Sequence, residues 1–286
     1  MADHERHAEI DSGIIVADGA LHYLPFETLM PPGGHFLGED LTVAYVPSAS
    51  VLAELPAPSG VRQKELLAYG NPYFGPGPPR PGTAQDVVRG LDVKDGLRLT
   101  PLPNTRYEVE GIAALYPTSM STKHLGRAAT KTSVQHENLA EYRRIHFATH
   151  AFIDERRPER SGIVLSKAGQ EDGILRINDI LALKLNADLV VLSACQTGLG
   201  KLMRGEGISG LTRAFLFAGT PRVVASLWNV NDAATTDLMK SFYRKMKDGL
   251  APARALQAAK LEMMRSGVAA YRAPYFWAAF VLMGEP

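Results

Sequence analysis

The sequence predicts an α/β fold in which helices cover both faces of a mostly parallel central sheet. Segments with the apolar spacing of helices separate the predicted strands along the chain. Strands that alternate with helices are typical of a parallel sheet packed between two helical layers. Four short, almost continuously apolar segments predict the buried strands: 144–149 (RIHFAT), 188–193 (DLVVLS), 222–227 (RVVASL) and 278–283 (AAFVLM).

The composition sets limits on size, partners and compartment. The chain has 286 residues, of which 45% are hydrophobic, enough for one large domain or two tightly fused halves. A net charge of +1 argues against direct nucleic-acid binding. No apolar stretch is long enough to span a membrane, and the polar start does not resemble a signal peptide. The single cysteine excludes an intramolecular disulfide and fits a cytoplasmic location.

The first hundred residues contain turn and strand signals. Residues 14–24 combine two apolar runs around Asp18-Gly19, which predicts a hairpin. Residues 41–46 alternate weakly in polarity and predict another strand. Residues 71–83 are dense in proline and glycine, which excludes a helix or a central strand and predicts a loop or boundary.

Helix signals dominate the rest of the chain. Apolar residues at helical spacing predict a helix that begins near Arg106 and ends at Pro117. Four later helices are expected at 179–185, capped by Asn178, at 206–218, stopped by Gly219, at 232–247 and at 251–265.

Two of the predicted strands lead into reactive residues. Strand 144–149 runs into His150, and strand 188–193 runs through Ala194 into Cys195. Functional sites of parallel sheets lie beyond the carboxyl ends of the strands. We therefore expect both side chains on loops at one edge, within reach of each other if the strands are neighbours. A lone cysteine is often a small buried hydrophobe, but its place at a strand end favours a nucleophile.

This pair has the chemistry of a cysteine peptidase. A free thiol with a pKa of about 8.5 is mostly protonated at neutral pH, so an adjacent imidazole is needed to accept its proton and later to protonate the leaving amine. Backbone N–H groups must hold the oxyanion of the intermediate. Ala151 and Cys195 follow strand ends and are the predicted N–H donors.

Longer segments around both residues resemble a known family. Residues 146–166 (HFATHAFIDERRPERSGIVLS), 189–201 (LVVLSACQTGLGK) and 204–232 are similar to the CHAT family of caspase-like cysteine peptidases, which shares a clan with caspases, gingipains and separases. Upstream pieces such as DGALHYLPFETL extend the resemblance to about Gly13. It implies a CHAT domain over residues 1–286 with a caspase-like, three-layer α/β/α sandwich. Residues 1–100 would form a degenerate caspase-like portion and residues 101–286 the catalytic portion.

The resemblance also implies a function and partners. It implies a Cys195/His150 endopeptidase that cleaves a protein substrate without a cofactor, under the control of a regulatory protein or of a TPR-type region in a longer protein. Relatives often carry glycine after the catalytic histidine, so Ala151 would be strained if that position needed a positive φ. A catalytically silent caspase-like interaction module and a ligase or transpeptidase on the same dyad are the alternatives.

Further candidates lie around the pair. The segment with Trp228, Asn229 and Asp232 resembles the lining of a specificity pocket, where Asp232 either receives a lysine or arginine side chain or caps the following helix. Asp154 is expected to have one of three roles: it orients the imidazole of His150, it binds a basic residue of the substrate, or it is an exposed acid of the loop. His146 could form a metal pair with His150, but a packing role is favoured and no metal site is predicted. The glycine-rich segment 198–207 matches no nucleotide-binding motif and is expected to form a mobile loop beside Cys195.

Overall fold

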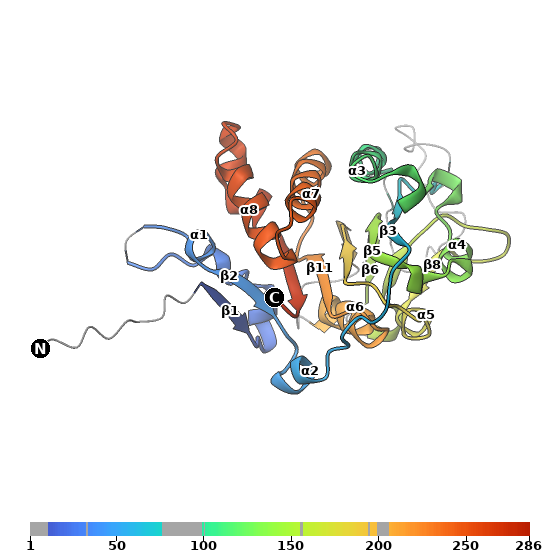
Figure 1. The fold of residues 1–286 in the computed structure, drawn as a ribbon, viewed down its shortest axis with the longest axis horizontal. Helices are drawn as coiled ribbons and strands as arrows, with labels where there is room; N and C mark the ends of the chain where they lie inside the picture. Colours follow the sequence, from blue (N-terminus) through green and yellow to red (C-terminus); the bar gives the residue numbers. More distant parts are fainter. Residues whose placement is uncertain are drawn as a thin grey trace, which may run out of the picture.

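The computed structural model describes residues 11–32, 34–75, 99, 101–154, 157–193, 195–198 and 206–286. For residues 195–198 and 206–208 it describes the backbone. These residues form a large central sheet between two helical layers (Figure 1). The α/β/α sandwich predicted from the sequence is therefore confirmed.

The described residues build an eight-stranded sheet in the order β1-β2-β12-β11-β9-β5-β3-β4. Every neighbouring pair is parallel except β11 and β12. N-terminal β1 and β2 therefore lie beside C-terminal β12, as Figure 1 shows. The strands are β1 Ser12–Ile15, β2 Thr42–Tyr45, β3 Lys64–Gly70, β4 Ser121–Leu125, β5 Tyr142–Ala148, β9 Leu189–Leu192, β11 Arg222–Ser226 and β12 Phe280–Gly284.

A second sheet stands beyond the carboxyl ends of β5 and β9. Its order is β10-β6-β7-β8, with β6 and β10 parallel and the other two pairs antiparallel. Its strands are β6 His150–Ile153, β7 Gly162–Val164, β8 Ile174–Arg176 and β10 Cys195–Gly198.

Helices cover both faces of the large sheet. In Figure 1, α3, α7 and α8 lie above the sheet, and α5 and α6 lie below it. The helices are α1 Leu37–Asp40, α2 Ala49–Ala53, α3 Asn104–Ala113, α4 Lys131–His136, α5 Ile177–Leu181, α6 Glu206–Phe217, α7 Asp232–Lys247, α8 Pro252–Met264 and α9 Pro274–Trp277. Short 3-10 segments lie at Gly19–Tyr23, Phe26–Thr28, Thr118–Met120, Gly126–Ala128, Leu139–Glu141, Pro158–Arg160 and Ala269–Arg272.

The core has two halves because successive strand residues face opposite sides of the sheet. In β5, Phe147 is buried against Phe215 of α6, whereas His146 contacts Tyr243 of α7. In β9, Val190 and Val191 belong to the two opposite core clusters. Burial on both faces explains why these strands are almost continuously apolar.

Two local predictions were wrong. Residues 14–24 do not form a hairpin, because β1 pairs in parallel with β2 and Gly19–Tyr23 forms a 3-10 helix. Gly19 does turn the chain with a φ of 55°, but a turn signal does not specify the pairing partner. Asn178 does not cap α5, because Arg176 is the N-cap residue and its N–H donates to Asp179 Oδ2 at 2.9 Å.

The remaining helix predictions agree with the structure to within a few residues. Helix α7 has the predicted bounds, and α6 ends before Gly219, whose φ is 116°. Strands β1, β2 and β3 of the predicted N-terminal portion belong to the same sheet as the later strands. The division at residue 100 stays a prediction. No helix among the described residues is long and apolar enough to cross a membrane.

Candidate active site

The strands that lead to His150 and Cys195 are neighbours in the large sheet. Strands β5 and β9 pair in parallel, and the chain continues from them into β6 and β10. Strands β6 and β10 also pair in parallel, with Cys195 opposite His150 in the register. The two residues predicted to meet at one sheet edge therefore lie side by side on neighbouring strands. They begin strands of the second sheet, so the expectation that both lie on loops was wrong.

The position of His150 is fixed by its surroundings. Its side chain is buried, with 2% relative exposure. The preceding Thr149 donates a hydrogen bond from Oγ1 to the carbonyl of Val164, which is also the residue opposite His150 in β7. On another side, the ring of Phe74 packs on the imidazole with centroids 5.5 Å apart and planes tilted by 41°. The Cys195 side chain lies outside the described part of the chain.

Ala151 follows His150 inside the second sheet. It pairs with Gln196 in β10 and with Ile163 in β7. Ala151 lies in the extended backbone of β6 and does not have a positive φ. Among the described residues other than glycine, the positive φ belongs to Asn71. Alanine therefore fits this position without the strain that a positive φ would impose. The oxyanion role of the Ala151 and Cys195 N–H groups stays a prediction.

A polar hollow lies near the carboxyl ends of β9 and β11, beside the start of α7. It is lined by Leu102, Thr105, Ser193, Ser226, Val230, Asp232, Thr235 and Phe280. Ser193 lies two positions before Cys195 in the sequence. The Ser193 and Thr235 side-chain hydroxyls are buried and have no hydrogen-bond partner among the described residues. Buried hydroxyls without a partner are costly, so a water molecule or another polar group in the hollow would be stabilised by hydrogen bonds to them.

Asp232 supplies the negative charge of this hollow. The residue is half-buried, and its Oδ2 accepts a hydrogen bond from the Asn104 N–H at 3.1 Å. Burial raises the pKa of Asp232 above its usual range, and the nearby Glu108 adds to this. No ion pair joins it to a cation among the described residues. Asp232 is not the N-cap of α7, because Asn231 Oδ1 accepts from the Ala233 and Ala234 N–H groups.

The other predicted binding residues have partners within the fold. Asp154 accepts from the Arg157 N–H at 2.9 Å and lies 3.8 Å from Arg160 Nη1, so its charge is balanced locally. The indole N–H of Trp228 donates to the Tyr275 carbonyl, and the Tyr275 hydroxyl donates to the carbonyl of Asn229. Glu155 and residues 199–205 of the glycine-rich segment lie outside the described residues.

His146 is a buried packing histidine, as favoured from the sequence. Its Nε2 lies 2.9 Å from Glu108 Oε1, and its Nδ1 lies 3.2 Å from the hydroxyl of Tyr243. His146 and Glu108 are both fully buried. The network ties α3 and α7 to the centre of β5, on the same side of the sheet as the polar hollow.

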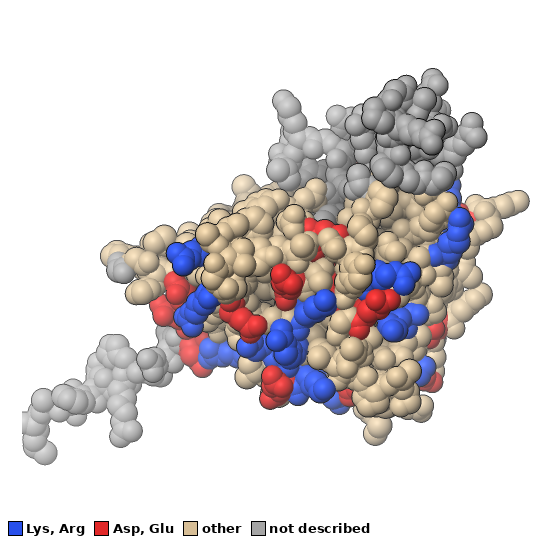
Figure 2. Space-filling view, turned by 90° about the horizontal axis from the view of Figure 1, so that it is seen from above, with Lys and Arg blue, Asp and Glu red and all other residues tan. Residues whose placement is uncertain are grey.

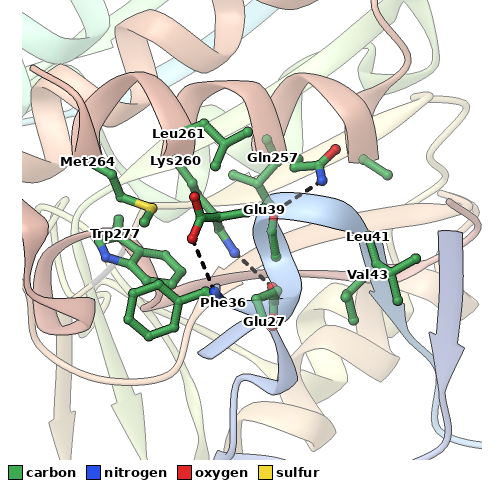
Figure 3. A pocket seen from close by; sticks show the side chains of 13 residues that line it. Glu27, Phe36, Glu39, Leu41, Val43, Gln257, Lys260, Leu261, Met264 and Trp277 are labelled. Atoms are coloured by element: carbon green, nitrogen blue, oxygen red, sulfur yellow. Dashed lines mark hydrogen bonds and ion pairs between the residues drawn. The ribbon is translucent and has the colours of Figure 1, made fainter. Parts of the chain in front are cut away.

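A second hollow lies at the other end of the sheet, between α8 and the segment around α1 (Figure 3). Its charged groups satisfy one another. Lys260 Nζ donates to Glu27 Oε1 at 2.8 Å, and the Tyr45 hydroxyl donates to Glu27 Oε2. Glu27 and Lys260 are 4% and 5% exposed. We interpret this hollow as a structural joint that attaches the N-terminal segment to α8.

Charges on the surface are mixed in sign. On the face viewed from above in Figure 2, lysine and arginine side chains are interspersed with aspartate and glutamate. Among the residues described there, no basic stripe of the kind that tracks a nucleic-acid backbone is formed.

Three residues near the site were missed by the sequence reasoning. Ser193 ends a predicted strand two residues before Cys195, and this position was a usable signal. Thr235 lies in the first turn of α7, and a threonine at that position gives no functional signal in the sequence. Phe74 lies in a proline- and glycine-rich loop without periodicity, so no sequence signal pointed to it.

Comparison with known proteins identifies the family. Residues 4–285 match the family model of the CHAT domain. The chain belongs to the CHAT domain family. It is 27% identical to Tetratricopeptide repeat protein 28 of Mus musculus and of Homo sapiens, over 98% of this chain. The chain spans 12% of the length of these two relatives.

Solved structures share the fold of this CHAT domain. A chain of the Saccharomyces cerevisiae separase–securin complex is 19% identical, with a TM-score of 0.55 over 93% of this chain and 15% of that chain. The Arg-specific cysteine proteinase gingipain R is 9% identical, with a TM-score of 0.58 over 99% of this chain and 65% of that chain. These matches confirm the caspase-like fold that the sequence predicted.

Proposed function

We propose that this CHAT domain is a cysteine endopeptidase that cleaves a protein substrate with Cys195 as nucleophile and His150 as its proton partner. The backbone register that pairs Cys195 with His150 is the observation that supports it. Neighbouring strands lie about 4.8 Å apart, and paired residues share a face of the sheet. Thiol and imidazole are therefore expected within reach of each other.

The proposed reaction follows from these two groups. His150 accepts the thiol proton, and the thiolate of Cys195 attacks the scissile carbonyl carbon. The N–H groups of Cys195 and Ala151 are the proposed donors to the resulting oxyanion. His150 then protonates the amine as the C–N bond breaks and a thioester forms. Water, deprotonated by His150, hydrolyses the thioester and restores the free thiol. No cofactor is required for these steps.

We further propose that the polar hollow binds a lysine or arginine side chain of the substrate. Asp232 is half-buried there without a cationic partner among the described residues, whereas the charge of Asp154 is balanced by Arg160. Ser193 and Thr235 offer two unsatisfied hydroxyls to the donors of a basic side chain. Trp228 and Asn229, held by Tyr275, are proposed to border the same binding site.

The setting of the domain is part of the proposal. Two relatives are named tetratricopeptide repeat proteins, and the chain matches a small part of each. We propose that the domain works in the cytoplasm within a longer protein, and that a TPR-type region or a separate regulatory protein controls access to the site. One matched structure, that of Saccharomyces cerevisiae separase, was solved in complex with securin and supports the idea that a protein partner can bind this fold.

The test is cleavage of a proteome-derived peptide library by the domain, with Cys195→Ala and His150→Gln as blanks. New termini that appear with the wild-type chain and with neither variant would support the peptidase, and an excess of lysine or arginine before the cleaved bond would support the pocket assignment. Joined peptides would instead indicate a ligase. If the wild type matches both blanks and Cys195 alkylates no faster than free cysteine, the domain is a silent interaction module.

A further inference from the structure

The loop that follows β3 is held at two points. Asn71 adopts a left-handed backbone with a φ of 47°, and its N–H donates to Thr105 Oγ1 of α3 at 2.8 Å. Two residues later, the N–H of Tyr73 donates to Ser166 Oγ at 2.7 Å. Ser166 Oγ in turn donates to the Gly126 carbonyl at 2.7 Å. The start of this loop is therefore fixed between α3 and the segment that follows β7.

The hydrogen bonds at Asn71 and Tyr73 place the next residue, Phe74, against the imidazole of His150. The two ring centroids are 5.5 Å apart, a normal distance for paired rings. Phe74 is also packed against a small apolar cluster of Leu99, Phe152 and Val164, which are all buried. The Phe74 ring therefore contacts both the imidazole and this apolar cluster.

We propose that Phe74 is a positioning residue that holds the His150 ring in the orientation needed to exchange a proton with Cys195. The inference rests on the proposed peptidase function. Thr149, bonded to the Val164 carbonyl, fixes the backbone before His150, and Phe74 fixes the side chain. Phe74 itself exchanges no proton. A misplacement of about 1 Å in such a pair can lower the rate about a hundredfold.

Substitutions at Phe74 separate positioning from folding. Phe74→Ala removes the ring, Phe74→Leu keeps an apolar side chain if the alanine variant does not fold, and Phe74→Tyr keeps the ring. Tyr73→Ala is the matched control, because Tyr73 lies in the same loop but stacks under the Arg127 guanidinium, 3.7 Å from the ring centroid. Thermal melting of all four variants shows which of them fold.

Three measurements decide the proposal. With the best library peptide, we expect kcat of Phe74→Ala to fall about 10- to 100-fold while KM changes less than about threefold. Phe74→Leu should lie between Phe74→Ala and the wild type, and Phe74→Tyr and Tyr73→Ala should stay within about threefold of the wild type. Iodoacetamide alkylation of the single cysteine should follow the same order. The ring signals of His150, assigned with His150→Gln in proton–carbon spectra, should broaden in Phe74→Ala as the imidazole exchanges between orientations. Line width is the readout, because loss of the Phe74 ring current shifts these signals by itself.

The outcomes separate this inference from the proposed function. If Phe74→Ala matches Tyr73→Ala in kcat, alkylation and the line widths of the His150 signals, Phe74 does not position the ring and the inference is wrong. If the wild-type thiol alkylates like free cysteine and cleaves nothing, the peptidase proposal fails instead. In that case the line widths of the His150 signals still show whether Phe74 holds the ring, and unchanged line widths in a folded Phe74→Ala overturn the inference.

Discussion

The substitution Asp232→Asn tests the proposed pocket most directly. The amide keeps an oxygen that can accept the Asn104 N–H, as Oδ2 of Asp232 does at 3.1 Å, and it removes the negative charge. We expect cleavage after lysine and arginine to lose efficiency while cleavage after uncharged residues changes little. Asp154→Asn is the matched control, because the Asp154 carboxylate is already paired with Arg160.

The magnitude follows from the half-buried position of Asp232. Two unit charges about 4 Å apart attract by about 4 kcal/mol at an effective dielectric of about 20, and desolvation of the guest offsets part of this. Loss of one partner from a buried charge pair costs about 2–5 kcal/mol, and half-burial favours the lower end of that range. A loss of about 2–3 kcal/mol corresponds to a fall in kcat/KM of roughly 30- to 150-fold.

The assay compares kcat/KM for matched peptides that differ only at the residue before the cleaved bond, with lysine, arginine, leucine or alanine. Asp232→Asn should lower the values for the two basic peptides by the stated factor and those for the others by less than about threefold. Equal losses on all four peptides, or a larger selective loss in Asp154→Asn, would refute the assignment of Asp232.

The same variant makes a prediction about stability and pH. Burial raises the pKa of Asp232, so the ionised carboxylate is disfavoured in the folded state. A group with a raised folded pKa contributes full stability below its unfolded pKa, and that contribution is lost as pH rises through the folded pKa. Asp232→Asn should therefore melt at the same or a higher temperature than the wild type at pH 7. The difference should vanish at a pH below the ordinary aspartate value of 3.8. A lower melting temperature at pH 7 would contradict this.

Two further predictions concern stability, each with a matched control. Lys260→Met leaves Glu27 buried without its cation and should lower the free energy of unfolding by about 3–5 kcal/mol in urea titrations. Lys245→Met breaks a solvent-accessible ion pair between α7 and Glu262 of α8, and it should cost at most about 1 kcal/mol. Equal losses in the two variants would contradict the role of burial. Gly219→Ala combines a φ of 116° with a Cβ that would lie 2.5 Å from the Leu185 carbonyl oxygen, so it should cost about 2–4 kcal/mol. Gly249→Ala, with a φ of 99° and open space, should cost about 1–2 kcal/mol, and a similar melting temperature for both would argue against the clash.

The sequence by itself determined the fold class and the two residues of the candidate dyad. Local apolar patterns in the sequence specify the buried parallel strands and the longer helices. Segments such as 189–192 and 232–247 were therefore predicted close to their observed bounds. His150 and Cys195 stood out because each follows such a strand. A strand end is a local feature, and parallel strands bring their carboxyl ends to one edge.

The tertiary structure alone decided which groups meet. Pairing of β1 with β2, the antiparallel contact of β11 with β12 and the Cys195–His150 register depend on hydrogen bonds between segments far apart in the chain. Local periodicity does not encode those bonds. For the same reason, the Asn104 N–H at Asp232 and the Phe74 ring on His150 became visible only in the folded chain, where long-range packing brings separate loops and helix ends together.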